Sequence, residues 1–463
     1  MAQDKKIMDA LCAKLYAILS AGDNVNNVPL AGRTLVSYCS PGIPLAISDV
    51  DFGFLSQNQN QFDAASAFFN LVDTIPNPTG FWSTSNTKMS KEYEKVLTTK
   101  ILPITNLSQQ ELDMLDRAKK MLNQDTQVLD IYTGQTRIVT GDTPLFERYK
   151  ALKTLYENAV LSYNSLYFNS LNASDQRSRI EWSINEPVYK SRVQTAYQTW
   201  LPVKQNIEQA LSIIENLDGR GATKYWSELL EDFNNAKQAG GSIGEEIRLT
   251  KYFPDSFWDE AHKDSWTKFS FKSSEINTID TQTSSSWGGG ASASFGLWSI
   301  GGDASYSSQS KTYNSDSNNL NIDVELVKIP IRRSWFDGGI FKSRGWQFDP
   351  NINRDLLSDG GQPPKGTLIG YCTSIIVARN LNLYMDLSST RDSYVASQFS
   401  SSMKAGWGPF SIRGNYTRST QASTHNFSFD SGAISCPGMQ IIAFVNELLP
   451  LSPNPDPNLN WPH

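Results

Sequence analysis

The sequence has few of the residues that build catalytic and metal centres. Its 463 residues include only three histidines and four cysteines. No histidine stands at metal-ligand spacing from another ligand residue, and the cysteines are too scattered for a zinc site or a disulfide framework. We therefore expect no metal, no cofactor and no enzymatic activity, and the sequence leaves the disulfide state open. The residues concerned are His262, His425, His463, Cys12, Cys39, Cys372 and Cys436.

Positive charge and long hydrophobic runs are also scarce. The formal net charge is −6, so there is no overall positive field to attract a nucleic acid. The longest apolar stretch, residues 368–387, contains Arg379, Asn380 and Asn382, whereas a membrane-spanning helix needs roughly 18 apolar residues without such interruptions. We expect neither nucleic-acid binding nor a transmembrane helix.

The start of the chain has lysines ahead of an apolar run. Asp9 and Lys14 interrupt that run, so the segment predicts an amphipathic helix and not a signal peptide. We therefore expect a soluble protein made without a classical signal peptide, which stays in the cytoplasm or is released by a non-classical route.

Helix signals dominate the first half of the chain. Ser108 followed by Glu111 forms a capping box, which predicts a helix over residues 108–122. From Thr143 and Pro144 onward, apolar residues step alternately by four and three positions, which predicts a long helix with a packing seam. A second seam of the same kind follows it.

The two seams predict a pair of long antiparallel helices, and Pro202 should kink the second. At about 1.5 Å rise per residue each helix would reach roughly 40 Å, so the molecule should be elongated. The first seam consists of Leu145, Tyr149, Leu152, Tyr156, Ala159, Tyr163 and Leu166, and the second of Tyr189, Val193, Ala196, Trp200, Val203, Ile207, Ala210, Ile214 and Leu217.

Beyond residue 260 the apolar period changes to two, which is typical of strands. Alternation occurs around Phe271 and over residues 320–326, and residues 368–387 and 439–449 form two longer, largely apolar strands. The sequence thus predicts an α+β protein with an elongated helical N-terminal half and an antiparallel sheet. Its predicted parts are a helical domain at 1–245, a β-rich domain at 246–449 and a Pro/Asn-rich tail at 450–463.

Two Ser/Gly-rich segments, 283–314 and 397–430, repeat one pattern within the β-rich part. Alignment of Gly296 with Gly408 matches apolar with apolar and serine with serine in the two copies. The tips would be Gly296-Leu297 and Gly408-Pro409, because a type II′ turn takes glycine at its first central position and tolerates proline at the second. Each segment should form a tight hairpin.

Both predicted hairpins have one apolar face. That face could meet lipid as the outside of a transmembrane β-barrel, whose strands need about 9–11 alternating residues. It could equally belong to an ordinary half-buried antiparallel sheet that the helical half covers. The residues that would contact the membrane or an assembly partner are Ala293, Phe295, Leu297, Trp298, Ile300, Tyr306, Met403, Trp407, Phe410, Ile412 and Tyr416.

The order strand, hairpin, strand, linker around residues 335–346, strand, hairpin, strand resembles pore-forming proteins of the perforin, cholesterol-dependent cytolysin and gasdermin type. The resemblance implies a four-stranded core that extends two hairpins per subunit into a barrel. This sequence lacks the signature of the perforin group, and the hairpins of those families begin as helices. The Ser/Thr-rich hairpins are closer in style to the single insertion loop of aerolysins.

The whole chain also resembles a family of bacterial and fungal proteins of similar length, which have a helical first half and two such hairpins. Residues 296–302 and 406–411 carry that resemblance. The family has no settled activity, so the resemblance supports the arrangement of the chain and not a mechanism.

These observations lead to the hypothesis of a pore-forming or membrane-perturbing protein that oligomerises and inserts two hairpins per subunit. Its partners would be membrane lipid, further copies of the chain and an unknown cell-surface receptor. The helical half would bind that receptor, bind lipid or shield the hairpins. Arg332 and Arg333 would bind either an anionic headgroup or an acidic neighbour. The alternative hypothesis is a structural or interaction protein whose hairpins pair between subunits in water.

Overall fold

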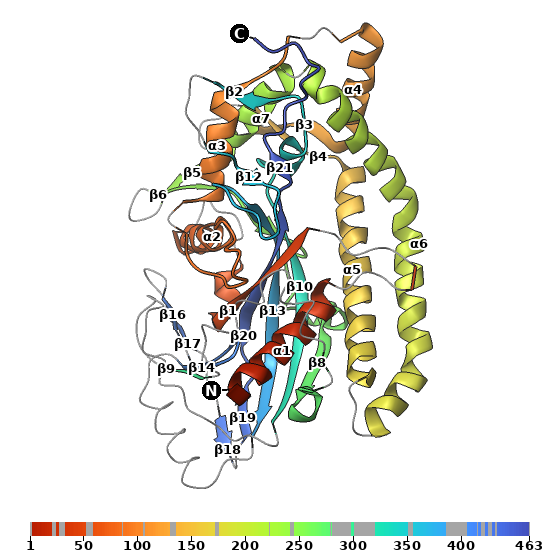
Figure 1. Cartoon of the computed structure of the whole chain (residues 1–463), viewed down its shortest axis with the longest axis vertical. Helices are drawn as coiled ribbons and strands as arrows, with labels where there is room; N and C mark the ends of the chain where they lie inside the picture. The colour runs from red at the N-terminus through yellow and green to blue at the C-terminus, as the bar shows by residue number, and fades with distance from the viewer. Residues whose placement is uncertain are drawn as a thin grey trace.

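The computed structural model describes residues 2–20, 25–26, 33–51, 59–85, 87–104, 107–129, 136–171, 176–221, 223–240, 245–277, 279, 298–300, 320–350, 355–385, 405–413, 415–417, 422–424, 428–430 and 433–462. Within these residues the chain forms seven α-helices and an antiparallel sheet, so the predicted α+β class is confirmed. The molecule is elongated, with a long helix pair along one side (Figure 1).

The central sheet is antiparallel and runs in the order β1-β20-β13-β10, with β8 and β7 on the far side of β10. The neighbour of β13 changes along its length: residues 370–378 pair with β20, and residues 381–384 pair with β19. Strand β18 pairs with β19. The strands are β1 (Thr34–Leu45), β7 (Lys251–Tyr252), β8 (Thr267–Lys272), β10 (Asn321–Arg332), β13 (Gly370–Tyr384), β18 (Ser428–Asp430), β19 (Ala433–Cys436) and β20 (Met439–Leu448).

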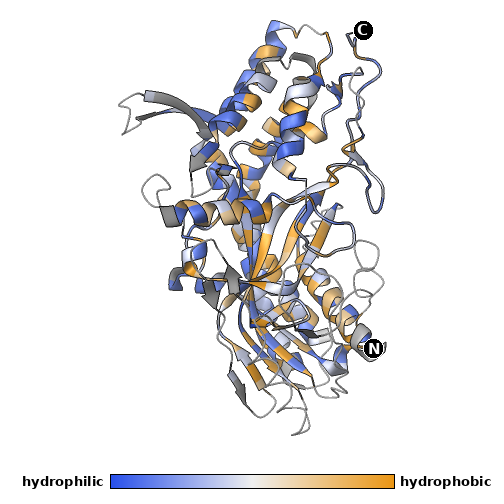
Figure 2. Cartoon of the chain, turned by 90° about the vertical axis from the view of Figure 1, so that its left-hand side faces the viewer, coloured by the Kyte–Doolittle hydropathy of each residue, from blue (hydrophilic) through white to orange (hydrophobic). Residues whose placement is uncertain are grey.

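Both faces of this sheet are buried. In β13, Ile375 and Val377 belong to one hydrophobic core, whereas Ile376 and Ala378 belong to another. Successive side chains of a strand point to opposite faces, so each face has its own core. This explains why residues 368–387 are almost continuously apolar and do not alternate. The apolar colour is concentrated in the strands of the sheet (Figure 2).

Helices from the first half of the chain cover both faces. Core residues of α2 (Gln59–Val72), α3 (Met89–Thr99) and α7 (Thr223–Asn235) pack with one face. Core residues of α1 (Ala2–Ser20) pack with the other. Figure 1 shows α1 in red, lying in front of the lower part of the sheet.

The predicted division at residue 245 therefore does not separate two cores. Strand β1 comes from the predicted helical domain, yet it pairs with β20 as the edge of the sheet. Tyr93 and Phe233 from the first half pack against Trp335 from the second. The predicted tail is also partly packed, because β21 (Leu451–Ser452) pairs with β12 (Ser358–Asp359). Periodicity identified the long helices and the long apolar strands of the second half, but it gave no information on which elements share a core.

The long helix pair confirms the predicted seams. Helices α5 (Pro144–Leu171) and α6 (Gln176–Gly221) lie side by side, and Tyr156 of α5 stacks on Trp200 of α6 at a centroid distance of 5.1 Å. Trp182 near the start of α6 contacts Tyr163 in the second half of α5, and residues 203–217 of α6 pack with the start of α5. The two helices are therefore antiparallel. Helix α6 has 46 residues and continues through Pro202.

The predicted helix starts are confirmed by their caps. Helix α4 (Gln109–Leu122), which packs on α6, begins after Ser108, whose backbone N–H donates to Glu111 at 2.9 Å in the predicted capping box. Helix α5 begins after Thr143, whose Oγ1 accepts from the Phe146 N–H at 3.1 Å.

The remaining strands form small two- and three-stranded sheets. They are β2 (Lys100–Ile101) with β11 (Gln347–Phe348), β3 (Asn123–Leu129) with β4 (Thr136–Asp142), β5 (Lys237–Gly240) with β6 (Glu245–Arg248), β16 (Asn415–Thr417) with β17 (Ala422–Thr424), and β9 (Trp298–Ile300) with β14 (Ala405–Trp407) and β15 (Phe410–Arg413).

The α5–α6 seam should be a main contributor to the stability of the helix pair. Ile207 is fully buried in it, so Ile207→Ala should lower the free energy of unfolding by about 2–5 kcal/mol through lost burial and a cavity. Ile184, on the same helix, is 65% exposed, so Ile184→Ala should change it by less than about 0.5 kcal/mol. Urea unfolding of both variants measures these changes. An equal loss of unfolding free energy in the two variants would contradict a stabilising role for the seam.

Candidate functional site

Four neighbouring strands of the central sheet end in one row. Lys272 at the end of β8 pairs with Asn321 at the start of β10. Asn321 also pairs with Tyr384 at the end of β13, and Tyr384 pairs with Ala433 at the start of β19. The row lies at the lower end of the sheet (Figure 1).

Two long inserts leave and re-enter the sheet at this row. The first insert, residues 273–320, joins β8 to β10, and the second insert, residues 385–432, joins β13 to β19. Each contains 48 residues, and each includes one of the repeated Ser/Gly-rich segments. Two inserts of equal length therefore connect adjacent pairs of strands at the same end of one sheet.

The structure describes only part of the predicted membrane-contact residues. Ala293, Phe295, Leu297, Tyr306 and Met403 lie outside the described residues. Trp298 and Ile300 fall in β9 and Tyr416 in β16, where the backbone alone is described. Trp407, Phe410 and Ile412 are described in full.

The tip of the second hairpin has the predicted turn. Trp407 pairs with Phe410 across the two-residue turn Gly408-Pro409. Gly408 has a φ of +55°, which suits glycine at the first central position, and proline supplies the negative φ at the second. The corresponding tip of the first hairpin, Gly296-Leu297, lies outside the described residues.

The two repeats pair with each other. Strand β9 of the first insert is antiparallel to β14 of the second, with Trp298 opposite Trp407 and Ile300 opposite Ala405. Together with β15 they form one three-stranded sheet. The sequence predicted two hairpins but carried no signal that they lie side by side.

The apolar face of the second hairpin is buried in this conformation. Trp407, Phe410 and Ile412 are each 0% exposed and belong to the same core as α1 and one face of the central sheet. The conformation described therefore places these three predicted contact residues in the protein interior, and their contact with lipid or with another copy of the chain stays a prediction. A helix and a sheet cover the apolar face of the hairpin, and Ser411 on the opposite face is buried as well.

The hairpin tip packs closely on β1 and β20, at a contact formed by Gly42 and Gln440 that we call the seat. Gln440 of β20 is fully buried, and its side-chain amide bonds both backbone groups of Ser411, accepting from the N–H at 2.5 Å and donating to the carbonyl oxygen at 3.1 Å. Gly42 of β1 lies so close that a Cβ there would stand 2.9 Å from the Pro409 carbonyl oxygen. The amide of Gln440 thus takes the place of a strand partner for the hairpin.

Helix α1 closes the seat from the other side. A Cβ on Gly408 would lie 3.2 Å from Met8 Cε and 3.5 Å from Leu11 Cδ2, so these side chains pack directly on the turn. The helix is itself held on the sheet by Tyr38 of β1, whose hydroxyl donates to the Cys12 carbonyl oxygen at 2.9 Å.

Helix α1 also contacts the first insert. Lys14 Nζ lies 2.6 Å from Glu275 Oε2, and the two side chains are 0% and 3% exposed. Glu275 is in a short 3-10 helix, Ser273–Glu275, that begins the insert directly after β8. The Lys14 ammonium is also 5.7 Å from the centre of the Phe269 ring.

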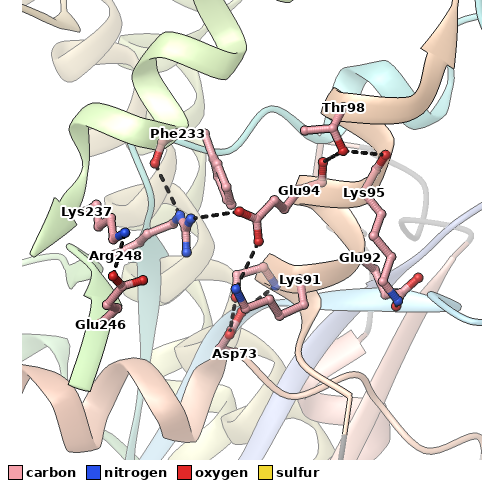
Figure 3. Close-up of polar contacts among 11 residues, drawn as sticks. Asp73, Lys91, Glu92, Glu94, Lys95, Thr98, Phe233, Lys237, Glu246 and Arg248 are labelled. Atoms are coloured by element: carbon pink, nitrogen blue, oxygen red, sulfur yellow. Dashed lines mark hydrogen bonds and ion pairs between the residues drawn. The ribbon is translucent and has the colours of Figure 1, made fainter. Parts of the chain in front are cut away.

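A second polar cluster lies away from the inserts, where α3 and α7 meet β6 (Figure 3). Arg248 donates to the Phe233 carbonyl oxygen at 3.2 Å, stacks on the Phe233 ring and lies 3.7 Å from Glu94. Burial raises the pKa of Asp73, which accepts from the Ser90 N–H at 2.8 Å and from its hydroxyl at 2.6 Å at the start of α3. These contacts hold the helices to the strand, and we assign them a structural role.

Arg332 and Arg333 have protein partners. Arg332 Nη1 lies 2.5 Å from Glu147 Oε2, so the acidic neighbour expected as one alternative is present. Arg333 donates to the backbone oxygens of Cys372 at 2.7 Å and Val72 at 2.9 Å. Both guanidinium groups tie β10 to neighbouring elements.

The part of the chain that the structure describes has neither a metal-ligand cluster nor a membrane-spanning helix. No group of three or more His, Cys, Asp or Glu side chains there is arranged to hold a metal ion. No helix there is long and apolar enough to cross a membrane.

Comparisons of the chain with protein-family models, with curated proteins and with solved structures gave no match. The resemblances that the sequence itself indicated therefore stay predictions, and a function must be inferred from the strand ends and the described parts of the inserts.

Gly42→Ala should loosen the hairpin tip from its seat. The new Cβ would stand 2.3 Å from Gln440 Oε1 and 2.9 Å from the Pro409 carbonyl oxygen, so the contact must open at a cost of about 1–3 kcal/mol. Hydrogen exchange should become faster in residues 405–413. Gly141→Ala is the matched control, because nothing lies within 4 Å of a Cβ there. Equal exchange in the two variants would contradict the seat.

Asp232 should make stability depend on pH. Burial, reinforced by Glu231, Glu228 and Asp125, raises its pKa to about 7. A carboxyl with a raised folded-state pKa stabilises the fold fully below its unfolded pKa of about 4, and that contribution is lost as the pH rises through about 7. Urea unfolding should show lower stability at about pH 8 than at about pH 5, and Asp232→Asn should reduce the difference. An unchanged difference would exclude Asp232 as its source.

Proposed function

We propose that this chain is a membrane-perturbing, pore-forming protein whose two inserts leave their folded positions and cross a bilayer as β-hairpins. The observation that carries the proposal is the row formed by Lys272, Asn321, Tyr384 and Ala433. Because the row is in register, strands continuing from it would form one four-stranded ribbon in which β8, β10, β13 and β19 keep one another as partners. Strand β18, which belongs to the second insert, would have to separate from β19.

The inserts are long enough for this role. Each has 48 residues, so each arm of an extended hairpin would have roughly 24 residues and reach about 80 Å. The hydrocarbon core of a bilayer is about 30 Å thick and needs about 9–11 residues per tilted strand. The remaining length would cross the headgroups and join the strands to the sheet.

The pattern of the second hairpin fits a barrel wall. Trp407, Phe410 and Ile412 share one face, and that face is buried against protein in the folded chain. Hydrophobic burial is non-directional, so lipid can replace α1 and the sheet as the apolar partner. A spanning sheet must also close on itself to satisfy every backbone group, so several copies would have to assemble.

The shielding role fits the helical half best among the three roles that the sequence left open. The cover over the hairpin tip comes from α1, which packs Met8 and Leu11 on Gly408. A cover of this kind would keep the apolar face from water until the chain reaches a membrane.

Assembly in water is the second candidate. It is favoured by the pairing of β9 with β14, in which segments of the two repeats join edge to edge without lipid. The same pairing between chains would give an oligomer by strand addition. This candidate predicts assembly that does not respond to liposomes.

Neighbouring positions on the predicted first arm of the second hairpin distinguish the two candidates. If the strand that contains Ala405 and Trp407 extends back through residue 401, residue 401 would share a face with Met403, Ala405 and Trp407, and residue 402 would face the other way. A polarity-sensitive fluorophore on Ser401→Cys should report an apolar environment when liposomes are added. The same fluorophore on Ser402→Cys should stay in a polar environment. Fluorescence with and without liposomes measures this.

The native cysteines should not interfere with this labelling. Burial raises the pKa of Cys12 and Cys436 to about 12 and that of Cys372 to about 11, and it raises the pKa of Cys39 as well. Neutral thiols react slowly, and three of the four, Cys39, Cys372 and Cys436, are also buried, whereas Cys12 is partly exposed. If both labels respond alike, the predicted hairpin insertion fails. If neither responds while the protein assembles in buffer, pore formation fails and assembly in water is supported.

A further inference from the structure

Helix α1 contacts both inserts at once. Lys14 pairs with Glu275 at the beginning of the first insert, and Met8 and Leu11 cover Gly408 at the tip of the second. Met8, Leu11 and Lys14 lie within two turns of α1. Met8 and Leu11 belong to the core that α1 shares with the sheet and the second hairpin. If α1 moves away, it therefore uncovers both inserts in the same step.

The Lys14–Glu275 pair is an unfavourable way to hold a helix in a core. Burial lowers the pKa of Lys14 and raises the pKa of Glu275, and in each case it outweighs the opposite charge; Lys272 is the other charged group near both. Each group is thus less stable in its charged form than in water, even with its partner present. An apolar pair of similar volume would hold such a site as well or better.

We propose that α1 is the release element for both inserts and that the buried Lys14–Glu275 pair sets how readily it detaches. This inference rests on the proposed function. It adds that the two hairpins are freed together, by one helix, and that the cost of freeing them is set by an ionic contact.

The balance of free energies follows from what each contact gains or loses on release. On release, the contacts between the apolar side chains of α1 and those of the hairpin are lost, but a bilayer can bury both apolar faces again. The ion pair behaves differently, since Lys14 and Glu275 both return to water and recover their hydration. The pair therefore lowers the cost of detachment, while the apolar contacts determine where α1 lies when it is attached.

The position of the pair couples it to the strand row. Glu275 stands three residues beyond Lys272, which ends β8 in that row. Detachment of α1 frees the chain at the point where the first insert must straighten into the strand direction. The same movement removes Met8 from Gly408, so the second tip loses its cover at the same time.

Lys14→Met combined with Glu275→Leu tests the inference, because it should keep the fold and strengthen the attachment. In the wild type without lipid, α1 and residues 405–413 should exchange amide hydrogens at similar rates and faster than β13, since both open locally. In the double variant both should slow by about tenfold or more, equivalent to about 1.4 kcal/mol. The rate of dye release from liposomes should fall by a similar factor.

Lys263→Met combined with Glu260→Leu is the matched control, because that pair is 59% and 83% exposed. It should leave the exchange of α1 and the release of dye unchanged. Exchange of α1 at the rate of β13 in the wild type, or slowing in α1 without slowing in residues 405–413, would overturn the inference.

The outcomes also separate this inference from the proposed function. If the exchange results are as expected but no protein releases dye from any liposome, pore formation fails and the coupling through α1 stands. If the wild type and the double variant release dye equally fast, the pore function stands and the role of the pair is wrong.

Discussion

The central sheet has two apolar faces, and both must be kept from water. Ile375 and Val377 of β13 face one core, and Ile376 and Ala378 face the other. Helices α2, α3 and α7 complete the first core, while α1 and the second hairpin complete much of the second. The second hairpin is therefore part of an insert that joins β13 to β19, and it also packs on the face of the sheet that contains these strands. The folded and extended positions of the hairpin exclude each other, because its apolar face cannot contact the protein core and lipid at the same time.

Two kinds of contact hold the hairpin in its folded position, and they differ in what can replace them. The burial of Trp407 and Phe410 has no direction, so any apolar surroundings supply it. The bonds from the Gln440 amide to Ser411 do have direction, and an extended strand must replace them with backbone pairing. A neighbouring strand in a barrel offers that pairing, and a lipid surface alone does not. This links departure of the hairpin from its seat to strand pairing, and therefore to assembly.

Local chemistry in the sequence was enough to predict the caps at Ser108 and Thr143, the α5–α6 seam and the turn at Gly408. Strand β1 was missed because Pro41, Gly42 and Pro44 interrupt the apolar pattern, although Gly42 is what allows the hairpin tip to approach. An amphipathic face indicates burial but not the identity of its partner, so Trp407 fitted lipid and a protein core equally well. The Lys14–Glu275 contact joins residues 261 positions apart, and no local pattern encodes it.

Pore formation requires the two inserts to cross a bilayer. Current across a planar lipid bilayer after addition of the purified protein is the decisive measurement, because only a continuous water path conducts ions. We expect stepwise increases of uniform size after a delay that shortens as protein concentration rises, since closure of a barrel requires several copies. A bilayer that stays silent at every protein concentration and lipid composition, while the protein remains folded in the buffer, would contradict pore formation.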